Sequence, residues 1–211
     1  MIKRYAIFLS GLFVASLGVA FSTKAGLGTS PVASVPYSIS LVNHALSFGW
    51  WLNLLGLVQV AVQVVLLQRR CKPLEIIVQT AVALLFGYLT DFSCKLLSSV
   101  NPVSYPARFA VMLIGGCVLA LGIWIQYKAG VAMMPGEAMN RAVSIVTGKR
   151  YENVKVFFDV LYIAVATLIC LIFVGKLSGV REGSVIAAIL VGNMVKVYNW
   201  AYDKFVGNRQ A

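Results

Sequence analysis

The chain contains few charged residues. Only 12% of its 211 residues are Asp, Glu, Lys or Arg, and only seven are acidic. Soluble domains carry about 25% charged residues, so this sequence lacks the polar surface of a water-soluble fold. Instead, 60% of its residues are apolar and the mean hydropathy is +0.85. The composition therefore excludes an ordinary soluble domain and indicates an all-α integral membrane protein.

Residues that could bind a metal ion are also scarce. His44 is the only histidine, and the four cysteines lie far apart at Cys71, Cys94, Cys117 and Cys170. No C-x-x-C pair or Cys/His spacing typical of a metal site is present. The phosphate-binding pattern GxxxxGK[ST] is missing, which excludes an ATPase built into the chain. We therefore expect no catalytic site, no metal and no cofactor.

Six apolar stretches are long enough to cross a bilayer, which takes about 20 helical residues at 1.5 Å per residue. They are residues 5–22, 50–67, 74–97, 107–127, 154–174 and 183–200. The charged start of the first stretch resembles a signal peptide. Because the same stretch recurs in mid-chain, we interpret it as the first transmembrane helix.

The recurrence is an internal repeat. Residues 4–31 and 108–135 match without a gap at a constant offset of 104, with 11 identities in 28 positions. Two unrelated apolar segments would share about 2 or 3. The identities are Arg4/Arg108, Ala6/Ala110, Leu9/Leu113, Gly11/Gly115, Val14/Val118, Leu17/Leu121, Gly18/Gly122, Lys24/Lys128, Ala25/Ala129, Gly26/Gly130 and Pro31/Pro135. We therefore divide one membrane domain into units 1–100 and 105–211.

The cations predict the topology, because cytoplasmic loops are enriched in Lys and Arg. With six spans and cytoplasmic termini, five cations lie outside, Lys196 lies within the last span, and twelve face inward: Lys3, Arg4, Arg69, Arg70, Lys72, Lys128, Arg141, Lys149, Arg150, Lys155, Lys204 and Arg209. A seventh span at residues 25–43 would move the 69–72 cluster outside. Three spans per unit predict two inverted repeats. The scattered cations also argue against nucleic-acid binding, despite the net charge of +11.

A glycine-bearing segment that ends on proline follows the first span of each unit. It reads KAGLGTSP at residues 24–31 and KAGVAMMP at residues 128–135. Proline is tolerated at the first helical position, so short helices are predicted over residues 31–43 and 135–147. Thr29 or Ser30 is expected to cap the first of them.

We interpret each segment as re-entrant. About seven extended residues would descend about 20 Å, and a helix of about 13 residues would return. The N-terminus of that helix then lies at membrane depth, where its free N–H groups and partial positive charge attract anions. The alternative is an interfacial helix that lies flat on the membrane surface. The second copy lacks the serine and threonine of the first, so we expect a polar solute to depend more on the first copy.

The candidate substrate-binding residues lie in these two segments and in the adjoining helices. They are Gly26, Gly28, Thr29, Ser30, Pro31, Asn53, Met134, Pro135 and Asn140. Substrate sites of duplicated transporters lie at the repeat interface, which is where both segments are expected to meet.

Three carboxylates are candidates for carrying a proton or a coupling ion, because ionisable groups at membrane depth are costly. Glu137 lies in the first turn of the second short helix, where it is alternatively a partner of the helix dipole. If two extra residues are allowed in unit two, Asp159 aligns with Asn53. A polar residue at the same depth in both units indicates a central polar cluster or, alternatively, an interhelix hydrogen bond. Asp91 aligns with Lys196, and the two are expected to pair.

Three stretches carry a resemblance to a known family. They are AGLGTSPVASVPY at residues 25–37, FFDV at residues 157–160 and VREGSVIAAILVG at residues 180–192. With them, nearly the whole chain resembles the YczE/YyaS/YitT-type family of small bacterial integral membrane proteins. The resemblance implies a multi-pass protein of the bacterial inner membrane and implies little chemistry.

The sequence favours a secondary transporter or exporter of a small, anionic or carboxylate-bearing solute, with a proton-coupled organic cation as a variant. A channel would use the two glycine-bearing segments as a filter. A non-transporting subunit or chaperone of another complex is a further alternative, and a membrane enzyme is the last. Expected partners are the solute, the lipid bilayer and a second copy of the chain in a homodimer.

Overall fold

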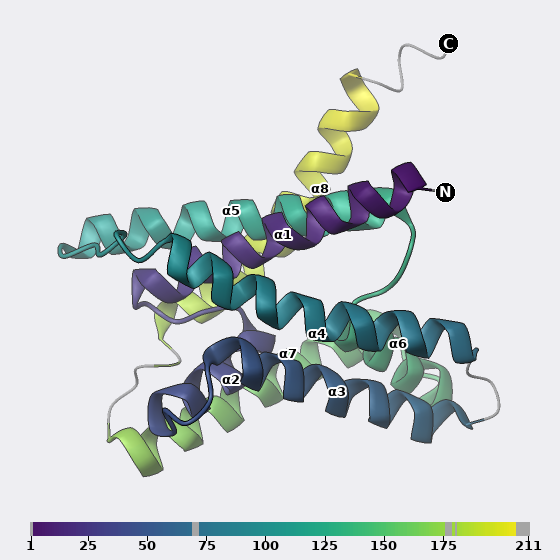
Figure 1. Cartoon of the computed structure of the whole chain (residues 1–211), viewed down its shortest axis with the longest axis horizontal. Coiled ribbons are helices and arrows are strands. Elements are labelled where there is room, and N and C mark those ends of the chain that lie inside the picture. Colours follow the sequence, from purple (N-terminus) through teal and green to yellow (C-terminus); the bar gives the residue numbers. More distant parts are fainter. Residues whose placement is uncertain (1, 69–71, 176–178, 180, 206–211) are drawn as a thin grey trace.

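The computed structural model describes residues 2–68, 72–175, 179 and 181–205, and these residues form helices without any strand (Figure 1). Four residues of the topology and cysteine arguments lie outside the described residues: Arg69, Arg70, Cys71 and Arg209. So do Lys176, one of the five cations predicted to face outward, and Val180 of the resemblance.

The six predicted spans are confirmed as helices that are long and apolar enough to cross a membrane. They are α1 (Ile2–Ala25), α3 (Phe48–Leu67), α4 (Pro73–Leu96), α5 (Tyr105–Ala129), α7 (Tyr151–Ile169), which continues through a π-helical turn (Cys170–Val174), and α8 (Glu182–Phe205). The two predicted short helices are α2 (Pro31–Val42) and α6 (Pro135–Thr147), and each begins on its proline.

Helices α1 and α5 pack against each other through glycines and run antiparallel. A Cβ atom added to Gly18 would lie 2.5 Å from Leu119 Cα, and one added to Gly122 would lie 2.6 Å from Ala15 Cα. Further along, Gly11 approaches the backbone of Gln126 in the same way. Small residues at these positions let two membrane helices approach closely, which increases their van der Waals contact.

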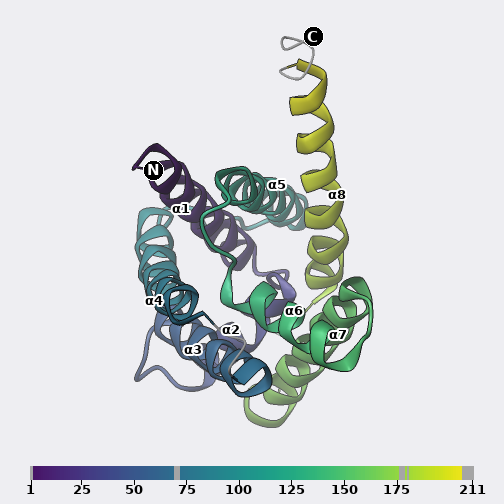
Figure 2. The same ribbon diagram turned by 90° about the vertical axis from the view of Figure 1, so that its right-hand side faces the viewer.

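The other helices lie beside and below this pair (Figure 2). Helix α4 packs on α1 and α8 packs on α5, while α3 and α7 lie on the far side of the molecule. The short helices lie between these layers, and each packs on a long helix of the other unit: α2 on α7, and α6 on α3. The interior is therefore built around the beginnings of the two short helices.

The turns that lead into the short helices are alike. Gly26 and Gly130 follow α1 and α5 with φ of 66° and 56°, a left-handed conformation that glycine adopts without steric cost. Arg4 Nε donates to Ala129 O at 3.0 Å, and Arg4 Nη2 donates to Gly130 O at 3.1 Å. The arginine thus binds carbonyls that the end of α5 leaves without helical partners.

Two expectations about these segments are wrong. The connection before each short helix has five residues, 26–30 and 130–134, rather than about seven, because α1 and α5 continue to Ala25 and Ala129. Ser30 occupies the N-cap position of α2 but makes no capping bond with its side chain. The Thr29 hydroxyl is also buried without a hydrogen-bond partner among the described residues. Neither Thr29 nor Ser30 therefore caps the N–H groups at the beginning of α2.

The expected pair of Asp91 and Lys196 is also wrong. Asp91 Oδ1 accepts from the backbone N–H of Gly49 at 2.8 Å, and Oδ2 accepts from the Ser47 hydroxyl. Asp91 thus ties the end of α4 to the beginning of α3, where a carboxylate stabilises free N–H groups. Lys196 lies exposed on α8, a helix that packs on α5 instead.

Candidate functional site

A cavity of about 320 Å³ lies where the two short helices begin. We call it the central cavity. Its walls are mostly apolar, and residues of all eight helices contribute to them. A volume near 300 Å³ lies at the lower end of the range for small-molecule sites, so the central cavity suits a small solute.

The first turns of both short helices face this cavity. Ser30, Pro31, Val32 and Ala33 line it from α2, and Met134, Pro135, Gly136 and Glu137 line it from α6. The first N–H groups of a helix have no partner within the helix. The first N–H groups and the partial positive charge of each short helix therefore lie at the same small cavity. This arrangement favours an anion.

Gln59 of α3 and Tyr162 of α7 join these elements. Gln59 Nε2 donates to the Tyr162 hydroxyl at 2.9 Å, and the Gln59 side chain lies against Gly136, where an added Cβ would be 3.3 Å from Nε2. The carbonyl of Tyr162 accepts from the Ser34 hydroxyl of α2 at 3.4 Å. This chain of contacts keeps the beginnings of α2 and α6 near each other.

An ion pair lies at the edge of the central cavity. Lys155 Nζ is 3.6 Å from Asp159 Oδ2, and the two side chains are 45% and 21% exposed. Both residues line the cavity from α7. Because the lysine is long and half exposed, its ammonium group can turn from Asp159 toward a bound anion.

Glu137 lies on α6, outside the six long helices, and lines the central cavity beside Tyr127. The Tyr127 hydroxyl donates to Glu137 Oε1 at 2.7 Å. Burial raises the pKa of Glu137 above its ordinary value, while this hydrogen bond and the charge of Lys155 oppose the increase. A raised pKa means that this carboxyl group keeps its proton to a higher pH than an exposed glutamate does.

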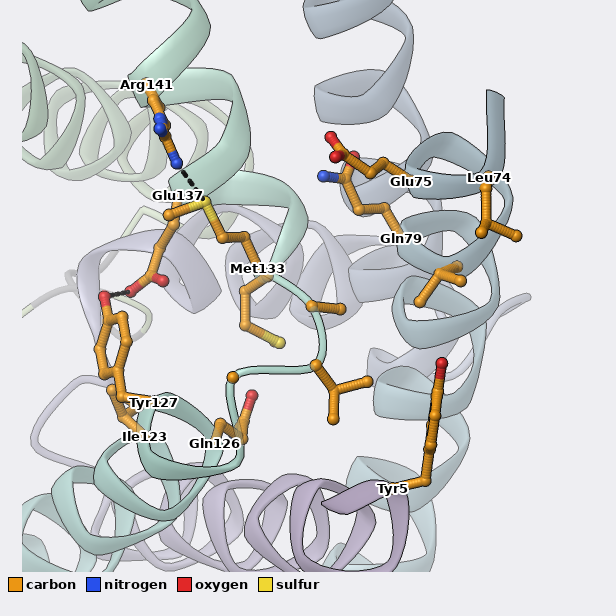
Figure 3. A pocket seen from close by; sticks show the side chains of 15 residues that line it. Tyr5, Leu74, Glu75, Gln79, Ile123, Gln126, Tyr127, Met133, Glu137 and Arg141 are labelled. Carbon is orange, nitrogen blue, oxygen red and sulfur yellow. Dashed lines mark hydrogen bonds between the residues drawn. The ribbon is translucent and has the colours of Figure 1, made fainter. Parts of the chain in front are cut away.

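A second cavity, of about 410 Å³, adjoins the first (Figure 3). We call it the vestibule. It is polar where α4 and α6 face it, with Glu75, Gln79 and Arg141 in its lining. Glu137 and Tyr127 line both cavities, so their hydrogen bond lies between the vestibule and the central cavity.

The structure brings half of the predicted site residues together. Ser30, Pro31, Met134, Pro135, Glu137 and Asp159 line the central cavity. The other six lie elsewhere: Gly26, Gly28, Thr29, Asn53, Asn140 and Asp91.

Each of these six has another position in the fold. Gly26 ends α1, and Asp91 binds the beginning of α3. Gly28 packs on the start of α8, where an added Cβ would lie 2.9 Å from Arg181 N. Thr29, Asn53 and Asn140 are buried, and each has a side-chain polar atom without a hydrogen-bond partner among the described residues.

Sequence reasoning missed four residues of the site. Lys155 fits the charge rule for cytoplasmic residues. An amide within a span, such as Gln59, predicts an interhelix hydrogen bond rather than a ligand contact, and Gln59 forms one with Tyr162. No pattern in the sequence points to Tyr127 or Tyr162. The spacing of Lys155 and Asp159, one helical turn apart, was a usable signal, because such residues lie on the same helix face. The tyrosines had no local signal, since their partners are distant in the sequence or belong to another helix.

Among the described residues, no group of three His, Cys, Asp or Glu side chains is placed to hold a metal ion.

Comparison with known proteins identifies the family of the chain. No curated protein and no solved structure matches the chain. Residues 2–200, almost the entire length, match a family described as being of unknown function. The chain therefore belongs to the family of unknown function DUF6198.

Proposed function

We propose that the protein is a secondary transporter or exporter of a small anionic solute, typically a carboxylate, across the bacterial inner membrane. One observation carries this proposal: the beginnings of both short helices and Lys155 line the same cavity. Each helix N-terminus acts as a partial charge of roughly +0.5. Free N–H groups and an ammonium group are the donors that bind carboxylates in proteins.

Charge balance links solute binding to the proton on Glu137. Lys155 and Asp159 neutralise each other, so the two helix beginnings leave the central cavity with a charge of about +1 when Glu137 is protonated. Ionised Glu137 cancels that charge. A carboxylate therefore binds more tightly when Glu137 is protonated, and the solute favours protonation by the same factor. Such linkage is what proton-coupled transport of an anion requires.

We propose that the two units are inverted repeats related by a two-fold axis in the membrane plane. The contacts between α1 and α5 support this arrangement, because the offset of 104 maps the contact of Gly18 with Leu119 onto that of Gly122 with Ala15. The same offset maps the contact of Gly11 with Gln126 onto that of Gly115 with Ser22. The reciprocal packing of α2 on α7 and of α6 on α3 obeys the same exchange.

In this proposal the short helices are the returning halves of re-entrant segments, and both chain termini lie in the cytoplasm. The supporting feature is the location of the beginnings of α2 and α6, which line the same cavity. Irregular backbone at membrane depth is tolerated where it lines a cavity. Transporters with inverted repeats hold their substrates at such a place.

Uptake into proteoliposomes tests the function. The purified protein is reconstituted and supplied with radiolabelled acetate, lactate, benzoate or glutamate, with and without an imposed pH gradient. We expect saturable uptake of at least one carboxylate that the gradient accelerates. A Lys155→Met variant is expected to lose most of this uptake, whereas Lys155→Arg keeps it.

The matched control is Lys95→Met, which removes the same charge from an exposed position on α4. Uptake that is equally reduced in Lys95→Met and Lys155→Met would contradict a specific role for the cavity lysine. Flux too fast for any transport cycle would instead indicate a channel. No flux of any probe, together with stoichiometric recovery of a partner protein, would favour the subunit role.

A further inference from the structure

Helix α8 forms one wall of the central cavity. The residues of this helix that line the cavity are all small or apolar: Ala187, Ala188, Val191, Gly192 and Val195. A helix spreads positions 187 to 195 over about 12 Å. A wall of this kind offers no side-chain hydrogen bond to a hydrophilic anion, whereas it provides a surface against which a hydrocarbon chain can be buried.

In unit one the corresponding pair of helices is sealed. A Cβ added to Gly87 of α4 would lie 2.5 Å from Asn53 Cγ of α3, and one added to Gly56 of α3 would lie 2.9 Å from Ala83 Cβ of α4. Helices α3 and α4 therefore pack tightly over this part of their length and leave no space for a ligand between them.

In unit two the corresponding pair of helices has an opening. Helix α8 rises away from α7 (Figure 2), and the described parts of the two helices make no comparable contact. A Cβ added to Gly192, the counterpart of Gly87, would meet nothing within 4 Å. Gly192 lines the central cavity and is also exposed on the surface of the molecule. The central cavity therefore opens to the outside between α7 and α8.

This opening leads to lipid. Helices α7 and α8 are both long and apolar enough to span a membrane. Large apolar side chains are exposed on each of them, including Val160 of α7 at 60% and Ile189 of α8 at 63%. Two exposed polar residues, Asn193 and Lys196, interrupt this surface on α8. The Asn193 Nδ2 donates to the Ile189 carbonyl of its own helix at 3.0 Å, and a lysine can extend its long side chain toward the membrane surface.

The polar end of the cavity lies next to this apolar wall. The beginnings of α2 and α6 line the same cavity as the α8 wall, and Lys155 and Asp159 line it from α7. Free N–H groups and an ammonium group bind a carboxylate, whereas the α8 wall and the lipid beyond it accommodate a hydrocarbon chain. A ligand that satisfies both parts of the cavity is amphipathic.

We infer that the solute is an amphipathic carboxylate with a single hydrocarbon chain, such as octanoate, and that it passes between the bilayer and the central cavity through the opening between α7 and α8. This inference rests on the proposed function and names the substrate class of the same site. The carboxylate binds at the beginnings of the short helices and Lys155, and the chain lies along the α8 wall. A chain longer than this wall continues through the opening into the lipid.

Competition binding tests the dependence on chain length. Protein in lipid nanodiscs binds radiolabelled octanoate, and unlabelled butanoate, hexanoate, octanoate or decanoate competes, while empty nanodiscs correct for partition into the lipid. We expect each added methylene to lower the competing concentration about fourfold until the chain reaches the lipid, because this is the factor for burying one methylene. Octanamide, which has the same chain without a charge, should compete at least about tenfold more weakly.

A leucine in the opening tests its location. Gly192→Leu places a side chain in the free space beside the cavity and is expected to weaken octanoate binding about tenfold, the loss of nearly two buried methylenes. Butanoate, whose chain is too short to reach the opening, should be affected much less. The matched control is Ala164→Leu, which adds the same side chain at an exposed position of α7 that does not line the cavity. It should leave the binding of both acids unchanged.

Photolabelling of the unmodified protein provides a second test that does not depend on a variant. Octanoate with a photoreactive group at its chain end should label α7 or α8. Labelling confined to α3 and α4 would overturn the inference. So would a competing concentration that does not fall with chain length, or one that falls equally in Gly192→Leu and the parent protein.

Failure of this inference is distinguishable from failure of the proposed function. Carboxylate uptake in proteoliposomes without any dependence of binding on chain length would leave transport standing and remove the amphipathic substrate. Chain-length-dependent binding at α7 and α8 without uptake would support the site and contradict transport.

Discussion

The close contact of α1 and α5 predicts the cost of adding one methyl group on either side of it. In Gly18→Ala the new Cβ would lie 2.5 Å from Leu119 Cα, and in Gly122→Ala it would lie 2.6 Å from Ala15 Cα. Ordinary carbon contacts are about 3.5 to 4.0 Å, so the helices must separate by about 1 Å. A gap of that size forfeits a quarter to a half of the contact energy across the interface. We expect each substitution to destabilise the protein by about 1 to 3 kcal/mol.

The two substitutions should not be additive. Separating α1 from α5 relieves both clashes at once, so the double variant should cost little more than the worse single variant. Unfolding in mixed detergent micelles, followed by the fluorescence of the four tryptophans, measures these differences. Gly192→Ala is the matched control, because its Cβ meets nothing within 4 Å and reports only the effect of alanine on the helix. Additive costs, or a cost no larger than that of Gly192→Ala, would refute this account of the interface.

Two further predictions concern Glu137 and Gly28. Because burial raises the pKa of Glu137, the infrared band of its protonated carboxyl should persist above pH 4.3, the approximate ordinary value. Glu137→Gln, which keeps an acceptor for Tyr127, should lose this band and gradient-driven uptake but keep solute exchange; unchanged gradient-driven uptake would contradict a coupling role. Gly28→Ala should destabilise the protein more than Gly148→Ala in thermal unfolding. Both glycines have positive φ, but only at Gly28 would a Cβ meet the backbone of another helix. Equal costs would contradict this packing.

The helices were predictable because their signals are local. Apolar length fixed the six spans, and the prolines at positions 31 and 135 marked the beginnings of the short helices. The repeat predicted that both short helices occupy corresponding places, and both do line one cavity. These properties depend on neighbouring residues or on direct comparison of the two units.

The details of the site depended on contacts that local patterns do not contain. Gly28 belongs to a loop expected to bind substrate, yet its close approach to α8 is set by a residue more than 150 positions away. The alignment of Asp91 with Lys196 predicts a pair between them, whereas Asp91 binds the beginning of α3 within its own unit. Lys155 follows the charge rule for cytoplasmic residues and still lines the cavity.

Sided labelling of two cysteines tests the central claim most directly. Ser30→Cys and Met134→Cys are placed singly in a cysteine-free protein, and a membrane-impermeant thiol reagent is applied from each side of the membrane in turn. The account predicts that both positions react from both sides, or that solute changes their reactivity, because both line one cavity that opens alternately. Reaction of Ser30→Cys only from outside and of Met134→Cys only from inside, unaffected by solute, would contradict it.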